Sequence, residues 1–134
     1  MPDAPTEALR DIYAAVQRHD SERLTEALAH DIEWTLPETV PWGGTHHGHL
    51  GVMAVVEIYE EHVDGLWADP DELIDAGDEL VVLGRVMGRA RATGQEFEVP
   101  FAHVWSLRDG VPSRFRGYYD AAPILAALSG GPSA

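Results

Sequence analysis

Apolar residues in the first part of the chain recur with the period of an α-helix. Four of them follow the i, i+3, i+4, i+7 spacing of one helix face: Leu9, Ile12, Tyr13 and Val16. This spacing predicts an amphipathic helix over residues 6–18. Asp20 or Ser21 can accept hydrogen bonds from the first N–H groups of a second helix, which ends before His30. Together the two segments predict a helical hairpin.

The period changes to two at residue 32. Residues 32–36 alternate between apolar and polar side chains and predict a short strand that Pro37 ends. The glycine-rich segment 38–51 predicts a loop, and the apolar spacing of residues 50–63 favours a third helix. The acidic stretch 67–79 predicts a loop, a weak strand and a turn.

The last third of the chain has the pattern of an antiparallel meander. Three strand-like runs, 80–92, 96–107 and 111–120, are separated by Thr93-Gly94 and Asp109-Gly110, dipeptides typical of hairpin turns. Residues 123–128 predict a short closing helix. Helices grouped first and strands grouped later favour the α+β class, with a curved antiparallel sheet covered on one face by about three helices.

Composition narrows the class of protein further. The 134 residues carry 23 acidic and nine basic side chains, a formal charge of −14, so nucleic acid and anionic membranes are not expected partners. The absence of cysteine excludes disulfides and thiolate chemistry. The first residues resemble no leader peptide, and a cytoplasmic location is expected. We expect one domain over residues 1–134, with its core at about 5–128 and a flexible tail at 129–134.

Two motifs carry a family resemblance. The loop PWGGTHHGHLGV and the hairpin PFAHVWSLRDGVPSRFRGYYD resemble SnoaL-like, ketosteroid-isomerase-related proteins of the nuclear transport factor two-like superfamily, and the resemblance covers residues 5 to 128. It implies a cone-shaped sheet around an apolar pocket, a small apolar ligand, no cofactor and a homodimer. Activities in that superfamily include isomerisation, polyketide cyclisation and simple ligand binding, so the fold alone does not choose among them.

The residues of a ketosteroid isomerase site are absent at the positions that the resemblance indicates. Leu36 and Ala102 occupy the positions of the two carboxyl groups, and neither side chain can exchange a proton. Tyr13 lies one residue from the expected tyrosine. Ketosteroid isomerase activity by that mechanism is therefore not expected.

The resemblance to SnoaL-like cyclases implies an acid–base pair carried by the last strands. In this chain the candidates for that pair are Asp120 and His103. Strand alternation places Arg116 and Tyr118 on the face of Asp120, and His103 can approach this row if its own face lines the pocket. A one-residue bulge would exchange the faces. The alternatives are an outward-facing His103 with Ala102 inside, and an Asp120 that caps the final helix.

The remaining candidates are binding residues. The cluster His46, His47 and His49 lacks the carboxylate and strand context of a metal site, so we predict no metal. One of these imidazoles, represented by His46, is expected at the pocket mouth. The full predicted substrate-binding set is Tyr13, Trp34, Trp42, His46, Tyr59, Phe101, Arg116 and Tyr118.

Two functions remain open at this point. The first is a cofactor-independent enzyme that performs acid–base chemistry of the cyclase or isomerase type on an apolar carbonyl compound. The second is a non-catalytic ligand-binding or dimerisation module of the same fold. A titratable pair inside an apolar pocket would favour the enzyme, and its absence would favour the binding module.

Overall fold

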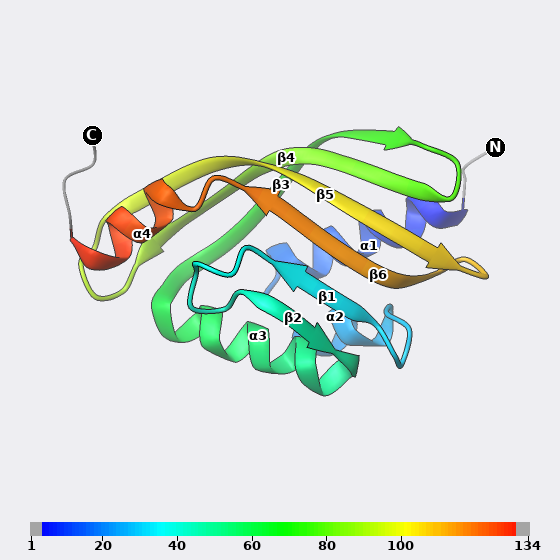
Figure 1. The fold of residues 1–134 in the computed structure, drawn as a ribbon, viewed down its shortest axis with the longest axis horizontal. Coiled ribbons are helices and arrows are strands. Elements are labelled where there is room, and N and C mark those ends of the chain that lie inside the picture. Colours follow the sequence, from blue (N-terminus) through cyan, green and yellow to red (C-terminus); the bar gives the residue numbers. More distant parts are fainter. Residues whose placement is uncertain (1–3, 131–134) are drawn as a thin grey trace.

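The fold combines four helices with one curved sheet, as Figure 1 shows for the computed structural model, which describes residues 4–130. In chain order the elements are α1 (Ala4–Gln17), α2 (Ser21–Glu26), β1 (Glu33–Leu36), β2 (Gly44–His47), α3 (Gly48–His62), β3 (Val63–Asp75), β4 (Glu79–Ala90), β5 (Glu96–Arg108), β6 (Val111–Tyr119) and α4 (Ala122–Ser129). The predicted α+β class is confirmed. Residues 131–134 of the predicted tail lie outside the described residues.

The six strands follow the order β2-β1-β6-β5-β4-β3. All neighbours are antiparallel except β1 and β6, which pair in parallel with Trp34 opposite Phe115. The expected wholly antiparallel sheet is therefore wrong in one pairing. This pairing joins residues about eighty positions apart, and local periodicity carries no information on such a contact.

Two segments contain more regular structure than the sequence predicts. Within the predicted loop 38–51, residues 44–47 form β2 and α3 begins at Gly48, whose φ of 73° favours glycine. Residues 67–75 of the acidic stretch belong to one long strand, β3, instead of a loop with a weak strand, and residues 76–78 form the predicted turn to β4. The strand lies at the edge of the sheet, where Pro70 costs no interior ladder bond and accompanies a register shift.

The long strands have one buried and one open face. On β5 the buried side chains are Phe97, Val99, Phe101, His103 and Trp105, and the even-numbered residues between them are more open. The hairpin turn between β5 and β6 has φ of 53° at Asp109 and 79° at Gly110, as a two-residue turn with two left-handed residues requires. The predicted turn is thus confirmed.

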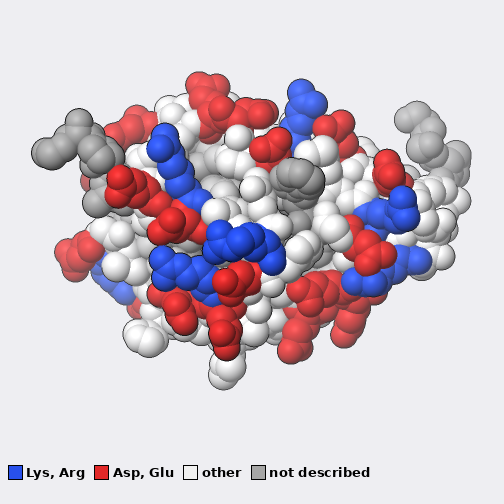
Figure 2. All heavy atoms as spheres, turned by 180° about the vertical axis from the view of Figure 1, so that it is seen from behind, with Lys and Arg blue, Asp and Glu red and all other residues white. Residues whose placement is uncertain are grey.

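The molecular surface is charged and mixed in sign. Figure 2 shows many acidic side chains, with basic ones among them, on the side turned away from the viewer in Figure 1. On the open face of the sheet, Arg85 with Glu98 and Arg89 with Glu96 form ion pairs between β4 and β5. Among the residues described, no helix is long and apolar enough to cross a membrane.

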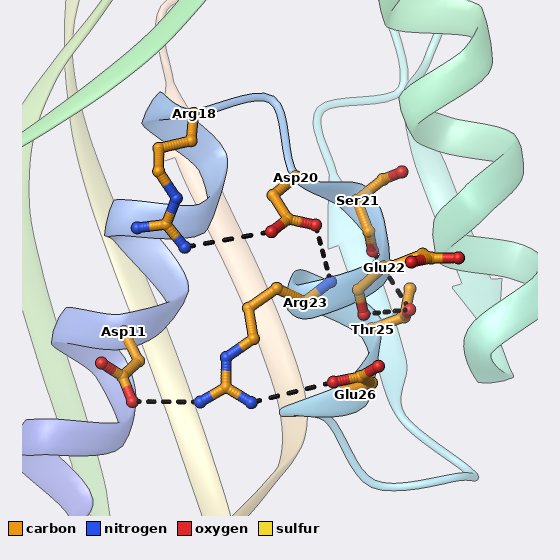
Figure 3. A network of polar contacts seen from close by, with 8 residues as sticks. All are labelled: Asp11, Arg18, Asp20, Ser21, Glu22, Arg23, Thr25 and Glu26. Atoms are coloured by element: carbon orange, nitrogen blue, oxygen red, sulfur yellow. Dashed lines mark hydrogen bonds and ion pairs between the residues drawn. The ribbon is translucent and has the colours of Figure 1, made fainter.

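The predicted helical hairpin is present, and polar contacts fix its second helix. The Asp20 side chain accepts a hydrogen bond from the Arg23 backbone N–H and so caps α2. The Arg23 guanidinium contacts Asp11 of α1 at 3.4 Å and Glu26 of α2 at 3.8 Å, as Figure 3 shows. The hairpin contributes Ile12, Tyr13 and Leu24 to the buried core.

Candidate functional site: an apolar cavity with paired aromatic donors

A cavity of about 110 Å³ lies between the sheet and the helices. Among the described residues, no charged side chain lines it. Its walls come from the helices α1, α2 and α3, from the strands β1, β3, β4, β5 and β6, and from the loop before β2. The lining residues are Ile12, Tyr13, Val16, Leu24, Trp34, Leu36, Trp42, Val55, Val56, Tyr59, Ala68, Val86, His103, Trp105, Phe115 and Tyr119. Such a surface favours an apolar, uncharged ligand.

A chain of hydrogen bonds runs along one wall of this cavity. The Trp105 Nε1–H group donates to the Tyr13 hydroxyl oxygen at 3.1 Å. The same hydroxyl lies 2.6 Å from Nδ1 of His103. Because an indole can only donate, the Tyr13 oxygen accepts from Trp105 and its proton is free to reach His103. In the arrangement that pairs this hydroxyl proton, Nδ1 accepts it and the neutral imidazole carries its own proton on Nε2.

Burial keeps this imidazole neutral. His103 is 7% exposed, and desolvation lowers its pKa to about 3. The ring stacks on Phe101 with the centroids 3.7 Å apart. Within residues 4–130 the only hydrogen bond of this imidazole is the one at Nδ1. His103 therefore contributes an unpaired N–H donor to the cavity wall, and at neutral pH it is a weak base.

The other polar groups of the cavity are uncharged as well. Trp42 donates from Nε1 to the Tyr119 hydroxyl at 3.1 Å. Nε1 of Trp34 and the hydroxyl of Tyr59 are buried and have no partner among the described residues. Burial raises the pKa of Tyr13, Tyr59 and Tyr119, so all three hydroxyls keep their protons.

A glycine lies opposite His103, and neighbouring side chains fill the space where its Cβ would be. The register of β5 and β6 pairs His103 with Gly117, and Gly117 is buried. A Cβ at this position would lie 2.6 Å from Cδ2 of Leu36 and 3.2 Å from Cζ of Phe115, two side chains of the cavity wall. The glycine thus allows Leu36 and Phe115 to pack directly against the backbone of β6 opposite the imidazole.

The structure brings five of the predicted site residues to the cavity, namely Tyr13, Trp34, Trp42, Tyr59 and His103. Phe101 is buried directly behind the imidazole. Ala102 lies opposite Tyr118 on the other face of the sheet, so His103 is the inward-facing residue of this pair. The imidazole and Tyr13 meet through a hydrogen bond that residue spacing could not predict.

The predicted common face of His103, Arg116 and Asp120 is wrong, because the β5–β6 hairpin contains a bulge. Near the turn Arg108 pairs with Val111. Between Leu107 and Ser106 the register shifts by one residue, so that Ser106 pairs with Arg114 instead of Ser113. Arg116 therefore lies opposite Val104 and faces the outer side, where it forms an ion pair with Glu79. A shift of one residue exchanges the two faces of a strand.

The remaining candidates lie away from the cavity wall. Asp120 is exposed, and its Oδ1 accepts a hydrogen bond from the Ala122 N–H at the start of α4 at 3.0 Å. Tyr118 is 52% exposed on the outer face. Nε2 of His46 lies 2.9 Å from the Gly43 carbonyl oxygen and donates to it. The two catalytic candidates, His103 and Asp120, are thus not brought together.

The histidines around β2 are directed at backbone groups. Nε2 of His49 donates to the Leu28 carbonyl oxygen at 2.9 Å, in the same way as His46 on Gly43. Within residues 4–130 no group of three or more His, Asp or Glu side chains is arranged to hold a metal ion. That the protein needs no metal stays a prediction.

Sequence reasoning missed three aromatic residues of the site, Trp105, Phe115 and Tyr119. Trp105 shares the strand face of His103, so alternation alone could have found it. Phe115 and Tyr119 lie on the face of β6 that the bulge turns inward. The alternation of Phe115 with the charged Arg114 and Arg116 is the signal that could have found this face.

Comparisons with known proteins agree with this geometry. The model of the SnoaL-like domain matches residues 9–114, so the chain belongs to the SnoaL-like domain family. A nuclear transport factor two-like protein from Burkholderia pseudomallei is 30% identical, with a TM-score of 0.89 over 96% of this chain and 99% of that chain. Another from Burkholderia thailandensis is 33% identical, with a TM-score of 0.87 over 95% and 98%.

A further structure in this group was solved with a ligand. TerC, co-crystallised with polyporic acid, is 27% identical, with a TM-score of 0.87 over 95% of this chain and 99% of that chain. No curated protein matches the sequence significantly. The predicted family is thus confirmed, and the site itself must indicate the function.

Proposed function

We propose that this protein binds a small, uncharged carbonyl compound in the cavity and holds the carbonyl oxygen with Nε2–H of His103. The observation that carries the proposal is the hydrogen-bond chain from Trp105 through Tyr13 to His103, which supports the tautomer with the proton on Nε2 and thus a donor at that nitrogen. A neutral donor in an apolar wall stabilises a carbonyl oxygen without the desolvation cost of a buried cation. The relative crystallised with polyporic acid supports an organic ligand.

The size of the cavity limits the ligand. Its volume of about 110 Å³ is below the roughly 150 Å³ of an engineered protein cavity that holds benzene. A single six-membered ring is therefore the largest probe to use. Cyclohexanone fits this description, and methylenecyclohexane has the same shape with a CH₂ group in place of the oxygen.

Binding of these two probes, measured by NMR titration, tests the proposal. His103→Phe removes the donor, so we expect it to weaken cyclohexanone binding about tenfold and methylenecyclohexane binding less than twofold, as the loss of one hydrogen bond implies. His47→Phe, the same change at an exposed position of β2, is the control and should alter neither. Equal losses for both probes, or no loss for the ketone, would contradict the proposal.

Catalysis is the second candidate. A hydrogen bond from His103 polarises a carbonyl group and acidifies the neighbouring carbon, which is the first requirement of cyclase or isomerase chemistry. The lining residues include no carboxylate that could take up the proton. We therefore place ligand binding first. Enolisation of bound cyclohexanone can be followed as deuterium exchange at its α-carbon. If the wild-type protein accelerates this exchange and the His103→Phe variant does not, catalysis would take precedence over ligand binding.

We also propose the homodimer that the resemblance implies. Support comes from the outer face of the sheet, where Val81, Leu83, Ala102 and Val104 are only partly buried and Tyr118 is exposed. Apolar side chains on an uncovered sheet face favour association. Light scattering at micromolar concentration should give twice the chain mass, and a monomer mass would contradict the dimer.

A further inference from the structure

A second, smaller hollow lies directly outside the apolar cavity. It has a volume of about 30 Å³ and lies where the turn between α1 and α2 faces α3. The cavity and this outer hollow share three apolar side chains, which therefore separate one space from the other: Val16, Leu24 and Val56. Toward the surface the outer hollow is bordered by polar residues, namely His19, Asp20, Ser21 and Glu60. A path from the surface to the cavity thus passes between the three shared side chains.

Two of these three side chains are already partly exposed. Val16 and Val56 are half-buried, whereas most residues of the cavity wall are buried. The other half-buried wall residues are Leu36 and Tyr119. On that side Tyr119 accepts a hydrogen bond from Trp42 at 3.1 Å, which ties the loop before β2 to β6. An opening there would break this hydrogen bond, whereas an opening between the valines would not.

No polar contact among the described residues holds the helical hairpin against the middle of α3. The hydrogen bonds and ion pairs of residues 15–26 stay within the hairpin or, in one case, reach β3. Figure 3 shows this for Arg23, whose guanidinium contacts Asp11 of α1 at 3.4 Å. The first turn of α3 is fixed separately, because Nε2 of His49 donates to the Leu28 carbonyl oxygen. Side chains between the hairpin and α3 can therefore rotate without breaking a hydrogen bond.

We infer that molecules enter and leave the cavity between the α1–α2 turn and α3, and that Val16, Leu24 and Val56 form an apolar gate across this entrance. The gate opens when these side chains and the two helical segments that carry them move apart. The inference rests on the proposed function only in that it takes the cavity to be a binding site. Xenon tests the gate without the carbonyl contact, since it enters apolar cavities without a hydrogen bond.

A cross-link over the outer hollow tests the entrance. The chain contains no cysteine, so Ser21→Cys/Glu60→Cys supplies one pair of thiols, and a short bifunctional thiol reagent joins them within one chain. We expect the joined protein to exchange xenon at least about tenfold more slowly than the wild type, as NMR saturation transfer measures, because the gate can no longer widen. The affinity for xenon should stay the same, since the cavity wall is intact.

The control is a cross-link within the hairpin. Asp11→Cys/Arg23→Cys, joined by the same reagent, connects α1 to α2 where the native side chains are already in contact, and it leaves α3 free. It should alter neither the exchange rate nor the affinity. Unchanged exchange in the protein joined across the outer hollow would place the entrance elsewhere and overturn the inference. A wild-type protein that takes up no xenon would overturn it too, because a gated cavity must fill.

A second variant needs no cross-link. Val56→Ala removes two methyl groups from the gate, so we expect xenon to leave about threefold faster or more. Val111→Ala makes the same change at an exposed valine outside the cavity wall and should leave the rate unchanged. An equal or slower rate in Val56→Ala would contradict the gate. Failure of the proposed function has a different signature, namely a cyclohexanone affinity indifferent to His103→Phe in a protein whose xenon exchange still responds to Val56→Ala.

Discussion

The two faces of strands β4, β5 and β6 carry polar groups of opposite kinds. The outer face uses full charges, such as the ion pair of Arg85 with Glu98 at 3.3 Å, and leaves them in water. The inner face uses the neutral groups of Trp105, Tyr13 and His103 and buries them. Water solvates and screens the outer charges. A charge in the cavity would lose this solvation, so uncharged donors are favoured there.

The difference teaches where recognition resides in this molecule. Exposed ion pairs contribute little to stability and do not define a shape. The buried chain orders three aromatic rings and favours the proton on one nitrogen of an imidazole. The four predictions that follow test this contrast between the faces, from the largest expected effect to the smallest.

Truncation of Trp105 should have the largest effect. The side chain is 1% exposed, and Trp105→Ala removes its packing together with the hydrogen bond to Tyr13. We expect a loss of about 3–5 kcal/mol in the free energy of unfolding. Urea denaturation measures it, with Arg85→Ala on the outer face as the control, expected to cost less than about 1 kcal/mol. Similar losses for the two variants would contradict the difference between the inner and outer faces.

Removal of the Tyr13 hydroxyl tests the chain itself. Tyr13→Phe keeps the ring but leaves Nε1–H of Trp105 and Nδ1 of His103 without their partner. Because unpaired buried groups each destabilise, the free energy of unfolding should fall by about 2–3 kcal/mol. Urea denaturation with Tyr118→Phe as the matched exposed control checks this, and a loss below about 0.5 kcal/mol would mean that the chain does not stabilise the fold.

Acid should destabilise the protein through His103. Its pKa is about 3 in the folded state, against about 6.5 for an unperturbed histidine. Between these values the unfolded chain binds a proton that the folded chain does not, so stability falls as the pH falls. The contribution is about 2 kcal/mol between pH 7 and pH 5.

His103→Gln isolates this contribution. The wild-type protein should lose about 2 kcal/mol more than the variant over that pH range, measured by urea denaturation at pH 7, 6 and 5. The other histidines and the carboxylates are common to both proteins and cancel in the difference. Parallel pH profiles would show that His103 titrates normally in the folded state.

Substitution of Asp120 should have the smallest effect. Its carboxylate accepts from the Ala122 N–H and is exposed, and an asparagine accepts the same hydrogen bond almost equally well. Asp120→Asn should therefore change the free energy of unfolding by less than about 0.5 kcal/mol and leave the cyclohexanone affinity unchanged. A loss of α-deuterium exchange in this variant, if the wild-type protein catalyses that exchange, would restore Asp120 as a proton carrier.

Local pattern was sufficient for most of the fold. The apolar spacing of Leu9, Ile12 and Tyr13 predicts α1, and the Asp109-Gly110 dipeptide predicts the β5–β6 turn, since both features depend on neighbouring residues. The local pattern did not predict structure that depends on contacts between residues distant in the sequence. The acidic sequence of β3 is compatible with a strand only because that strand lies at the sheet edge, and the parallel β1–β6 pair joins distant parts of the chain.

The candidate site was less predictable than the fold because a one-residue bulge determines which face of β6 lines the cavity. The bulge between Ser106 and Leu107 in the β5–β6 register turns Phe115 and Tyr119 inward and Arg116 outward. The alternation of aromatic residues and arginines along β6 indicates the inward face, but the register counted from the turn without the bulge gives the opposite face. Trp34, Trp42 and Tyr59 were predicted correctly as wall residues, since large aromatic side chains on either side of a cavity are buried in either register.

The protonation of His103 tests the central claim most directly. The seven histidines can be resolved by ¹⁵N NMR, and His103→Gln assigns the resonances of interest. We predict a proton on Nε2, an unprotonated Nδ1 that accepts from Tyr13, and no change in either between pH 7.5 and pH 5. A proton on Nδ1, or a doubly protonated ring above pH 5, would contradict the account of a neutral donor facing the cavity.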